Sequence, residues 1–208
     1  MVWMFAVVYS KNTNQIINLH IIYMELYEQL IGFARAYPLI ISMSCFITYF
    51  LTNNIDLLLL TVFILLNDSV NHVLKYYICK PLLGGKKWPI IGSGNIPDGA
   101  KYCDLFVTGK GNGKPSSTSY GMPSGHSQNA AFFSSYVILN LLNNPFSNSV
   151  KIYGTIIFIS LAIGIMYSRV ILKCHTVQQV IAGGLIGSAL GAVYFKNKDK
   201  IKKLINLR

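Results

Sequence analysis

Long apolar segments separated by short polar turns dominate the chain. The apolar residues form continuous runs instead of spreading at amphipathic spacing, and five runs approach the length with which an α-helix crosses a hydrocarbon core of about 30 Å. The predicted spans are Ala34–Thr52, Ile55–Cys79, Ser127–Leu142, Val150–Tyr167 and Thr176–Phe195. The pattern predicts an all-α fold, a polytopic membrane helical bundle whose membrane domain occupies residues 34–195.

Residues 1–33 have a different pattern. The first nine are apolar but too few to cross a membrane, and from Ile16 to Phe33 apolar residues alternate with His20, Glu25, Glu28 and Gln29. This is typical of a helix that lies on the membrane surface. We therefore predict an N-terminal interfacial segment, with a crossing helix as the alternative.

Two polar regions and a glycine stripe complete the organisation. Residues 81–125 are rich in Gly, Pro, Ser and Lys and form a loop that caps the helices, whereas residues 196–208 form a basic tail that we expect to be cytosolic. In the last span, glycines recur every four residues and predict close approach of a neighbouring helix: Gly183, Gly187 and Gly191.

Composition and charge narrow the class of protein. The 208 residues are 52% hydrophobic and 12% charged, which is too apolar for an ordinary soluble domain. The formal net charge is +11, but the Lys and Arg residues stand between or after apolar runs, which argues against nucleic acid as a partner. An anionic lipid or phosphate in a membrane is the expected partner.

The four cysteines predict no metal centre. Cys45, Cys79, Cys103 and Cys174 contain no CxxC pair or zinc-type spacing and define no disulfide framework. A Cys79–Cys103 bridge in an oxidising lumen stays open as an alternative. We expect no metal or other cofactor.

Polar residues inside the second span point to a functional stripe. Asn67, Asn71 and Lys75 stand at positions i, i+4 and i+8, so they share one face of a helix and are costly in lipid. We predict that this face points inward. The alternative is a lysine that extends to the membrane surface beside ordinary interhelical hydrogen bonds.

Alternating span directions bring four candidate residues to one membrane face. Lys75 lies near the end of the second span, His126 at the start of the third, Arg169 at the end of the fourth and His175 at the start of the fifth. Two histidines and two cations without a carboxylate cluster suit phosphoryl transfer, in which one imidazole attacks phosphorus and the other protonates the leaving oxygen. Ser124 and Gly125 precede a helix, so their N–H groups are predicted oxyanion donors.

These residues resemble a known family. Pro123-Ser-Gly-His126 is similar to the PSGH motif of the type 2 phosphatidic acid phosphatases, and Ser168-Arg169 with His175 is similar to their SRxxxxxH motif. Within that superfamily, the residues around Asn67–Lys75, Tyr120–Gln128 and Tyr167–Gly184 most resemble the dolichyldiphosphatases. The resemblance implies a metal-free helical membrane phosphatase with His175 as nucleophile and His126 as general acid, Lys75 and Arg169 as phosphate ligands, and amide donors at Ser124 and Gly125.

Two positions depart from the superfamily pattern. Leu82 and Leu83 stand where the first motif has Arg-Pro, so we predict that Lys80 takes the place of the missing cation, because Pro81 should make Lys80 extended and let it reach the site. Gln179 stands where most members have the aspartate that orients the nucleophile. Gln179 is predicted to accept a hydrogen bond from the His175 imidazole, one turn away.

The leading function is therefore hydrolysis of a polyprenyl diphosphate of the dolichyl type, or of a related lipid phosphate, through a phosphohistidine. The alternatives are a lipid phosphate phosphatase of broad specificity, a degenerate member that binds phospholipid without turnover, and a channel. Because the basic tail should stay cytosolic, we expect the active site on the luminal or exoplasmic side of an endoplasmic reticulum-type membrane.

Overall fold

The computed structural model describes residues 2–100, 103 and 119–205, with side chains from Ile21 onward. The long helices are α1 (Val2–Thr52), α2 (Ile55–Val73), α4 (Gly125–Asn143), α5 (Asn148–Ile171) and α6 (Val177–Leu204). A π-helical turn, η1 (Leu74–Cys79), and a short helix, α3 (Lys80–Leu83), extend α2. The strands β1 (Lys87–Trp88) and β2 (Gly92–Ser93) pair antiparallel in the loop that follows.

The chain divides into two compact units, Met1–Ala34 and Arg35–Arg208. The first unit is the helical N-terminal part of α1. The interfacial position expected for residues 16–33 stays a prediction. The second unit holds the helical bundle and every predicted site residue.

Each of the five predicted spans is helical. In the described part of the chain, four helices are long and apolar enough to cross a membrane: Ile21–Thr52, Ile55–Leu83, Asn148–Ile171 and Val177–Leu204. The chain is therefore a helical membrane protein. The third predicted span is α4, which is not among these four and carries the buried polar residues Ser127, Gln128 and Asn129 in its first turns.

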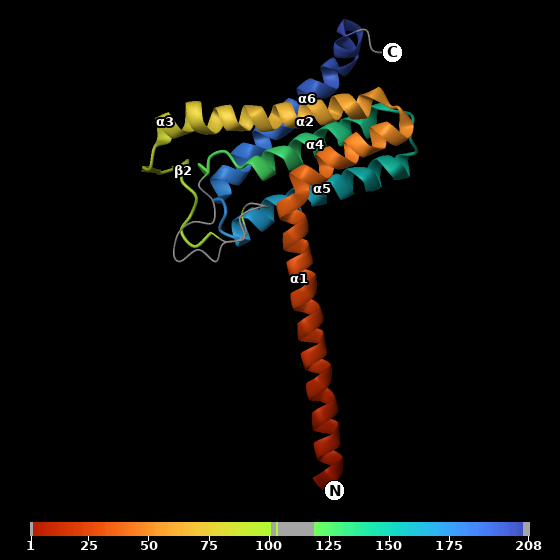
Figure 1. Cartoon of the computed structure of the whole chain (residues 1–208), viewed down its shortest axis with the longest axis vertical. Coiled ribbons are helices and arrows are strands. Elements are labelled where there is room, and N and C mark those ends of the chain that lie inside the picture. The colour runs from red at the N-terminus through yellow and green to blue at the C-terminus, as the bar shows by residue number, and fades with distance from the viewer. Residues whose placement is uncertain (1, 101–102, 104–118, 206–208) are drawn as a thin grey trace. The chain divides into compact units, whose positions relative to one another are not determined.

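Helix α4 is the centre of the bundle. It packs against α2, α5 and α6, and Figure 1 shows it between α2 and α5. Its contact with α6 is a backbone contact, as the glycine stripe predicts: a Cβ atom at Gly187 would meet the carbonyl oxygen of Gln128, and one at Gly191 would meet that of Phe132. The two helices approach closely only because these positions lack side chains.

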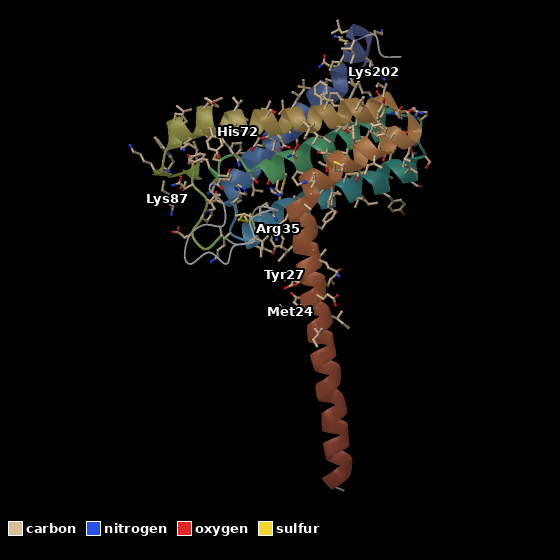
Figure 2. All side chains as sticks on the ribbon, in the orientation of Figure 1. Met24, Tyr27, Arg35, His72, Lys87 and Lys202 are labelled. Carbon is tan, nitrogen blue, oxygen red and sulfur yellow. A yellow bond between two sulfur atoms is a disulfide. The ribbon has the colours of Figure 1, made fainter. Side chains whose placement is uncertain are left out.

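The two ends of the bundle differ in chemistry. At the end away from the loop, Lys202 near the end of α6 lies 2.8 Å from Asp56 at the start of α2. Lys87 lies in the loop that follows η1 and α3, and Figure 2 shows Lys87 and Lys202 far apart. Since α2 runs from Asp56 toward the loop, the loop end collects the end of α2 and the starts of α4 and α6.

Candidate active site

Backbone hydrogen bonds join the segments that carry the predicted catalytic residues. The N–H of Ser124, before α4, donates to the carbonyl of Gln179 in the first turn of α6 at 3.0 Å. The N–H groups of Cys174 and His175 donate to the carbonyl of Arg169 in the last turn of α5 at 2.9 and 3.1 Å. The start of α4, the end of α5 and the start of α6 therefore form one connected site.

Gln179 fixes the orientation of His175. The Nδ1 atom of His175 lies 3.0 Å from the Oε1 atom of Gln179. An amide oxygen only accepts, so Nδ1 carries the proton and Nε2 keeps its lone pair. The predicted one-turn contact between the two side chains is present.

The loop holds Gln179 in turn. Its amide nitrogen donates to the carbonyl oxygens of Ser93 and Asn95, both at 2.8 Å, so the amide cannot rotate without losing two bonds. Thr176 caps α6, and its backbone N–H donates to the same Oε1 atom at 3.2 Å. The fully buried Gln179 thus links the β-hairpin loop to the imidazole of His175 through hydrogen bonds.

Burial keeps His175 neutral. Desolvation lowers the pKa of its imidazole to about 3, and the positive charges of Lys75 and Arg169 act in the same direction. Hydrogen bonds at Gln179 and Gly121 oppose the shift without cancelling it. A neutral imidazole at pH 7 is the form that attacks phosphorus.

Arg169 is held inside the protein. Its side chain is fully buried, its Nη1 donates to the carbonyl of Cys103 at 3.2 Å and its Nε donates to the hydroxyl of Ser168 at 3.2 Å. The guanidinium charge lowers the pKa of both His126 and His175. Arg169 therefore lies within electrostatic reach of both.

A disulfide bond joins the loop to this segment. Cys103 pairs with Cys174, the residue before His175, so the alternative of a Cys79–Cys103 bridge is wrong. The physical reason is placement, since Cys79 lies in η1 whereas Cys103 reaches the turn after α5. Cys103 thus provides a covalent tie to the His175 segment and a carbonyl to Arg169.

His126 lies at the start of α4, beside α1. Its Nε2 lies 3.0 Å from the carbonyl oxygen of Arg35, which only accepts, so Nε2 carries the proton. Burial lowers the pKa of His126 to about 3, and the positive charge of Arg169 adds to the effect. The side chain that caps α4 is Ser124, whose hydroxyl accepts from the N–H of Ser127.

The two predicted oxyanion donors, the N–H groups of Ser124 and Gly125, have different surroundings in the structure. Because the N–H of Ser124 donates to Gln179, the structure does not support its predicted role as an oxyanion donor. Gly125 is the first residue of α4, and its N–H stays a predicted donor. A Cβ atom at Gly125 would meet the amide oxygen of Asn71 at 3.1 Å, so a side chain there would crowd α2.

Lys75 lies in the π-helical turn and reaches toward the loop. Its ammonium donates to the hydroxyl of Ser119 at 3.2 Å, and its charge lowers the pKa of both histidines. Lys75 thus turns toward the site, as the inward stripe predicts. Isolated π-turns occur frequently at functional sites, because the extra residue changes the direction of the following side chains.

The extended conformation predicted for Lys80 is wrong. Lys80 is helical, with φ −64° and ψ −45°, since Pro81 occupies the first turn of α3, where a missing N–H is tolerated. The N–H of Lys80 donates to the carbonyl of Lys75, one π-turn back. Its ammonium lies 5.6 Å from the centre of the Tyr76 ring, and its role as a phosphate ligand stays a prediction.

A buried amide network supports the start of α4. Asn71 donates to Gln128 at 2.8 Å, Gln128 donates to Asn67 at 2.9 Å, and Asn67 donates to Asn129 at 2.7 Å. Asn129 in turn donates to the carboxylate of Asp68. The sequence indicated the α2 half of this network through its polar stripe, but gave no signal for Cys103, Ser93 or Arg35.

The described residues contain no group of three or more His, Cys, Asp or Glu side chains that could hold a metal ion. The chemistry available at the site is that of two imidazoles, a guanidinium and an ammonium. That set provides a nucleophile, a proton carrier and positive charge for a phosphate.

Comparison with known proteins gives the same family. The chain is 31% identical over 140 residues to dolichyldiphosphatase 1 of Rhinolophus ferrumequinum, which covers 64% of this chain and 48% of that protein. It is 40% identical over 80 residues to dolichyldiphosphatase 1 of Dictyostelium discoideum and to lipid phosphate phosphatase gamma of Arabidopsis thaliana, each match covering 37% of this chain and 35% of the relative. The chain therefore spans about half or less of the curated relatives it matches.

No solved structure matches the chain. The family model of the PAP2 superfamily matches residues 56–203, which contain His126, His175, Lys75, Arg169 and Gln179. The resemblance inferred from the PSGH and SRxxxxxH motifs is thus confirmed. The chain belongs to the PAP2 superfamily.

Proposed function

We propose that the chain is a membrane lipid phosphatase that removes the terminal phosphate of a polyprenyl diphosphate of the dolichyl type. One observation carries the proposal: Gln179 holds the proton of His175 on Nδ1 and leaves Nε2 as a neutral nucleophile, with Lys75 and Arg169 in electrostatic reach. Positive charge around a neutral imidazole suits attack on an anionic phosphate.

The reaction follows from these positions in two steps. The Nε2 atom of His175 attacks the terminal phosphorus, and the bond from phosphorus to the bridging oxygen breaks, so the lipid monophosphate leaves with the electron pair. His126 donates a proton to the leaving oxygen where its basicity requires one. Water then attacks the phosphohistidine, His126 accepts its proton, and inorganic phosphate leaves.

The substrate class rests on the relatives. Two of the three relatives are named dolichyldiphosphatase 1. A lipid phosphate phosphatase of broader specificity is the second candidate, because lipid phosphate phosphatase gamma matches over the same share of the chain.

Phosphate release from a substrate panel tests both candidates. The purified protein in one detergent is given dolichyl diphosphate, undecaprenyl diphosphate, phosphatidic acid and sphingosine phosphate, with His175→Asn as the control. We expect the highest kcat/KM with a polyprenyl diphosphate and none with the variant. Equal release from phosphatidic acid would favour the broader enzyme, and no release from any lipid would favour a degenerate phospholipid-binding member.

We also propose that the active site faces the lumen or exoplasmic space of an endoplasmic reticulum-type membrane. The Cys103–Cys174 disulfide supports this side, because disulfides persist in oxidising compartments. The lysines near the end of α6 support a cytosolic position for the opposite end. A glycosylation acceptor inserted in the loop between residues 81 and 125 should be modified, and modification only of an acceptor placed after Leu204 would reverse the orientation.

A further inference from the structure

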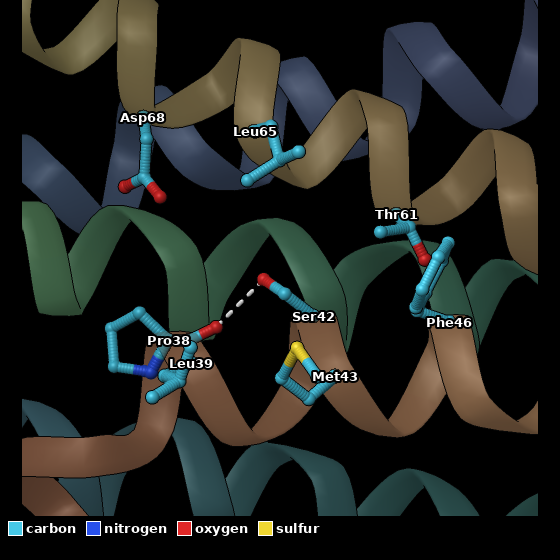
Figure 3. Close-up of a pocket in the computed structure, with 8 residues that line it drawn as sticks. All are labelled: Pro38, Leu39, Ser42, Met43, Phe46, Thr61, Leu65 and Asp68. Carbon is cyan, nitrogen blue, oxygen red and sulfur yellow. Dashed lines mark hydrogen bonds between the residues drawn. The ribbon is translucent and has the colours of Figure 1, made fainter.

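A cavity of about 470 Å³ lies between α1 and α2. Leu39, Met43 and Phe46 of α1 line one side, and Thr61, Leu65 and Asp68 of α2 line the other (Figure 3). The two hydroxyl groups in its lining already donate to carbonyls of their own helices. Ser42 donates to the carbonyl of Pro38 at 2.8 Å, and Thr61 donates to that of Leu57 at 2.9 Å. The cavity therefore offers an apolar lining with one carboxylate.

Two contacts connect this cavity to His126. On α1, the carbonyl of Arg35 lies 3.0 Å from His126 Nε2, and the cavity begins with Pro38, one helical turn further along. On α4, Asn129 follows His126 by one turn and donates to Asp68, which lines the cavity. The polar end of the cavity thus adjoins the general acid from two sides.

The proposed reaction requires the lipid chain of the substrate to lie on the His126 side of the site. In an in-line displacement, the nucleophile and the leaving oxygen lie on opposite sides of phosphorus. His126 protonates the leaving oxygen, so it marks the side on which the lipid departs. The hydrocarbon chain of the substrate is attached to that leaving group and must continue past His126 into an apolar space.

We infer that the α1/α2 cavity binds the first isoprenoid units of the substrate chain, an inference that rests on the proposed function. The cavity has the size of a small-molecule site and runs from the polar Asp68 end toward Thr61 and Phe46. Burial of an unbranched or methyl-branched chain there supplies affinity that a water-soluble phosphate lacks. The site discriminates lipid diphosphates from short ones by chain length.

A second cavity serves as the internal comparison. It measures about 500 Å³, is also apolar, and lies between α2 and α6, where Val70 and Val73 face Val193 and Tyr194. Its α2 residues lie on the face of that helix opposite to Thr61, Leu65 and Asp68, as positions about 180° apart require. Asn67 lines this cavity and also contacts Asn129, but none of its described lining residues belongs to α1, the helix whose Arg35 carbonyl contacts His126.

Matched bulky substitutions test the assignment. Met43→Trp and Leu65→Trp fill the first cavity, and Val70→Trp fills the second. For a long-chain polyprenyl diphosphate, we expect the first two to raise KM about tenfold or more, the effect of losing burial of about two methylene groups, and Val70→Trp to change it less than about twofold. Methyl diphosphate, which has no isoprenoid chain to place in the cavity, should be hydrolysed by all three as by the wild type.

The outcomes separate this inference from the proposed function. A wild type that hydrolyses no diphosphate contradicts the function itself. A wild type that does, with long-chain KM raised by Val70→Trp and not by Met43→Trp or Leu65→Trp, overturns the cavity assignment.

Photo-crosslinking provides a measurement that needs no substitution. A polyprenyl diphosphate with a diazirine on its first isoprene unit should label the α1 segment from Leu39 to Phe46, and excess polyprenyl monophosphate should suppress the labelling. Labelling of α6 between Leu190 and Ile201 would overturn the assignment. Labelling that the monophosphate does not suppress would identify the cavity as a site for bulk membrane lipid and would equally overturn it.

Discussion

The Nδ1 atom of His175 lies 3.0 Å from the Oε1 atom of Gln179, and the amide of Gln179 is anchored by two backbone carbonyls. In many histidine-dependent enzymes, a carboxylate has this position and stabilises the imidazolium by charge. A neutral amide selects the tautomer without adding charge. We therefore expect Gln179 to act by orienting the imidazole of His175.

Replacing Gln179 with alanine should lower kcat about 100-fold, the order of effect expected when a catalytic group loses a positioning partner in a buried site. The matched control is Gln178→Ala, because Gln178 is its exposed neighbour on the same turn. Steady-state kinetics with one substrate compare the two. Similar kcat values for both variants would show that the hydrogen bond does not position the nucleophile.

The low pKa of His126 predicts a pH dependence that varies with the leaving group. In the free site, burial and the nearby Arg169 charge lower the pKa to about 3, so His126 is neutral at pH 7. A bound phosphate anion offsets the positive charges and raises the protonated fraction, which also grows as pH falls. Activity on a poor leaving group, such as the alkoxide of phosphatidic acid, should therefore rise from pH 8 to pH 5, whereas a diphosphate should respond less.

His126→Asn tests that assignment. General acid catalysis typically contributes about 100- to 10,000-fold, so the variant should lose at least about 100-fold on phosphatidic acid and much less on a diphosphate. Its activity on phosphatidic acid should also lose the rise at low pH. An equal loss on both substrates at every pH would argue that His126 acts in binding instead.

Cys103 is expected to position Arg169 through its carbonyl group. Cys103→Ser should weaken inhibition by vanadate, a phosphate mimic, about tenfold, because the loop is then no longer tied to Cys174 and the guanidinium loses a fixed acceptor. Cys79→Ser is the control, since Cys79 forms no disulfide.

A double-mutant cycle separates positioning from general stability. In an Arg169→Ala background, Cys103→Ser should have no further effect on vanadate inhibition, although it should still lower the thermal unfolding midpoint. If the two substitutions instead weaken vanadate independently, the disulfide does not act through Arg169.

The contact between α4 and α6 predicts a strict requirement for glycine. At Gly187, an added methyl group would meet the carbonyl oxygen of Gln128, so Gly187→Ala should destabilise the bundle by about 1–3 kcal/mol. At Gly164 in α5, no atom lies within 4 Å of an added Cβ, so Gly164→Ala should be neutral or stabilising by about 0.5–1 kcal/mol. Thermal unfolding in detergent compares them, and equal midpoints would contradict the close helix contact.

The sequence predicted the helices from the length and polarity of the apolar runs. It predicted that the candidate site residues lie at one end of the bundle because consecutive spans alternate in direction. Hydrophobic runs specify spans, and an even number of crossings returns Lys75, His126, Arg169 and His175 to one side. The one-turn spacing of His175 and Gln179 likewise specified a contact. These are local rules, which the fold of the loop does not alter.

Other features depended on interactions that no local rule contains. A π-turn formed at Leu74–Cys79, and Lys80 stayed helical because Pro81 falls in the first turn of α3, where a proline is tolerated. The loop fold selected Cys174 as the partner of Cys103. The amide of Ser124 was engaged by Gln179, which lies 55 positions later in the chain.

The central claim is that His175 becomes phosphorylated during turnover. The most direct test uses polyprenyl diphosphate labelled with ³²P on the terminal phosphate as the substrate. The reaction is quenched rapidly without acid, and the labelled peptide is then mapped. The account predicts an acid-labile, base-stable phosphohistidine at His175 that is absent from His175→Asn and persists longer in His126→Asn, in which water activation is slower. Turnover without label on His175, or label on another residue, would contradict it.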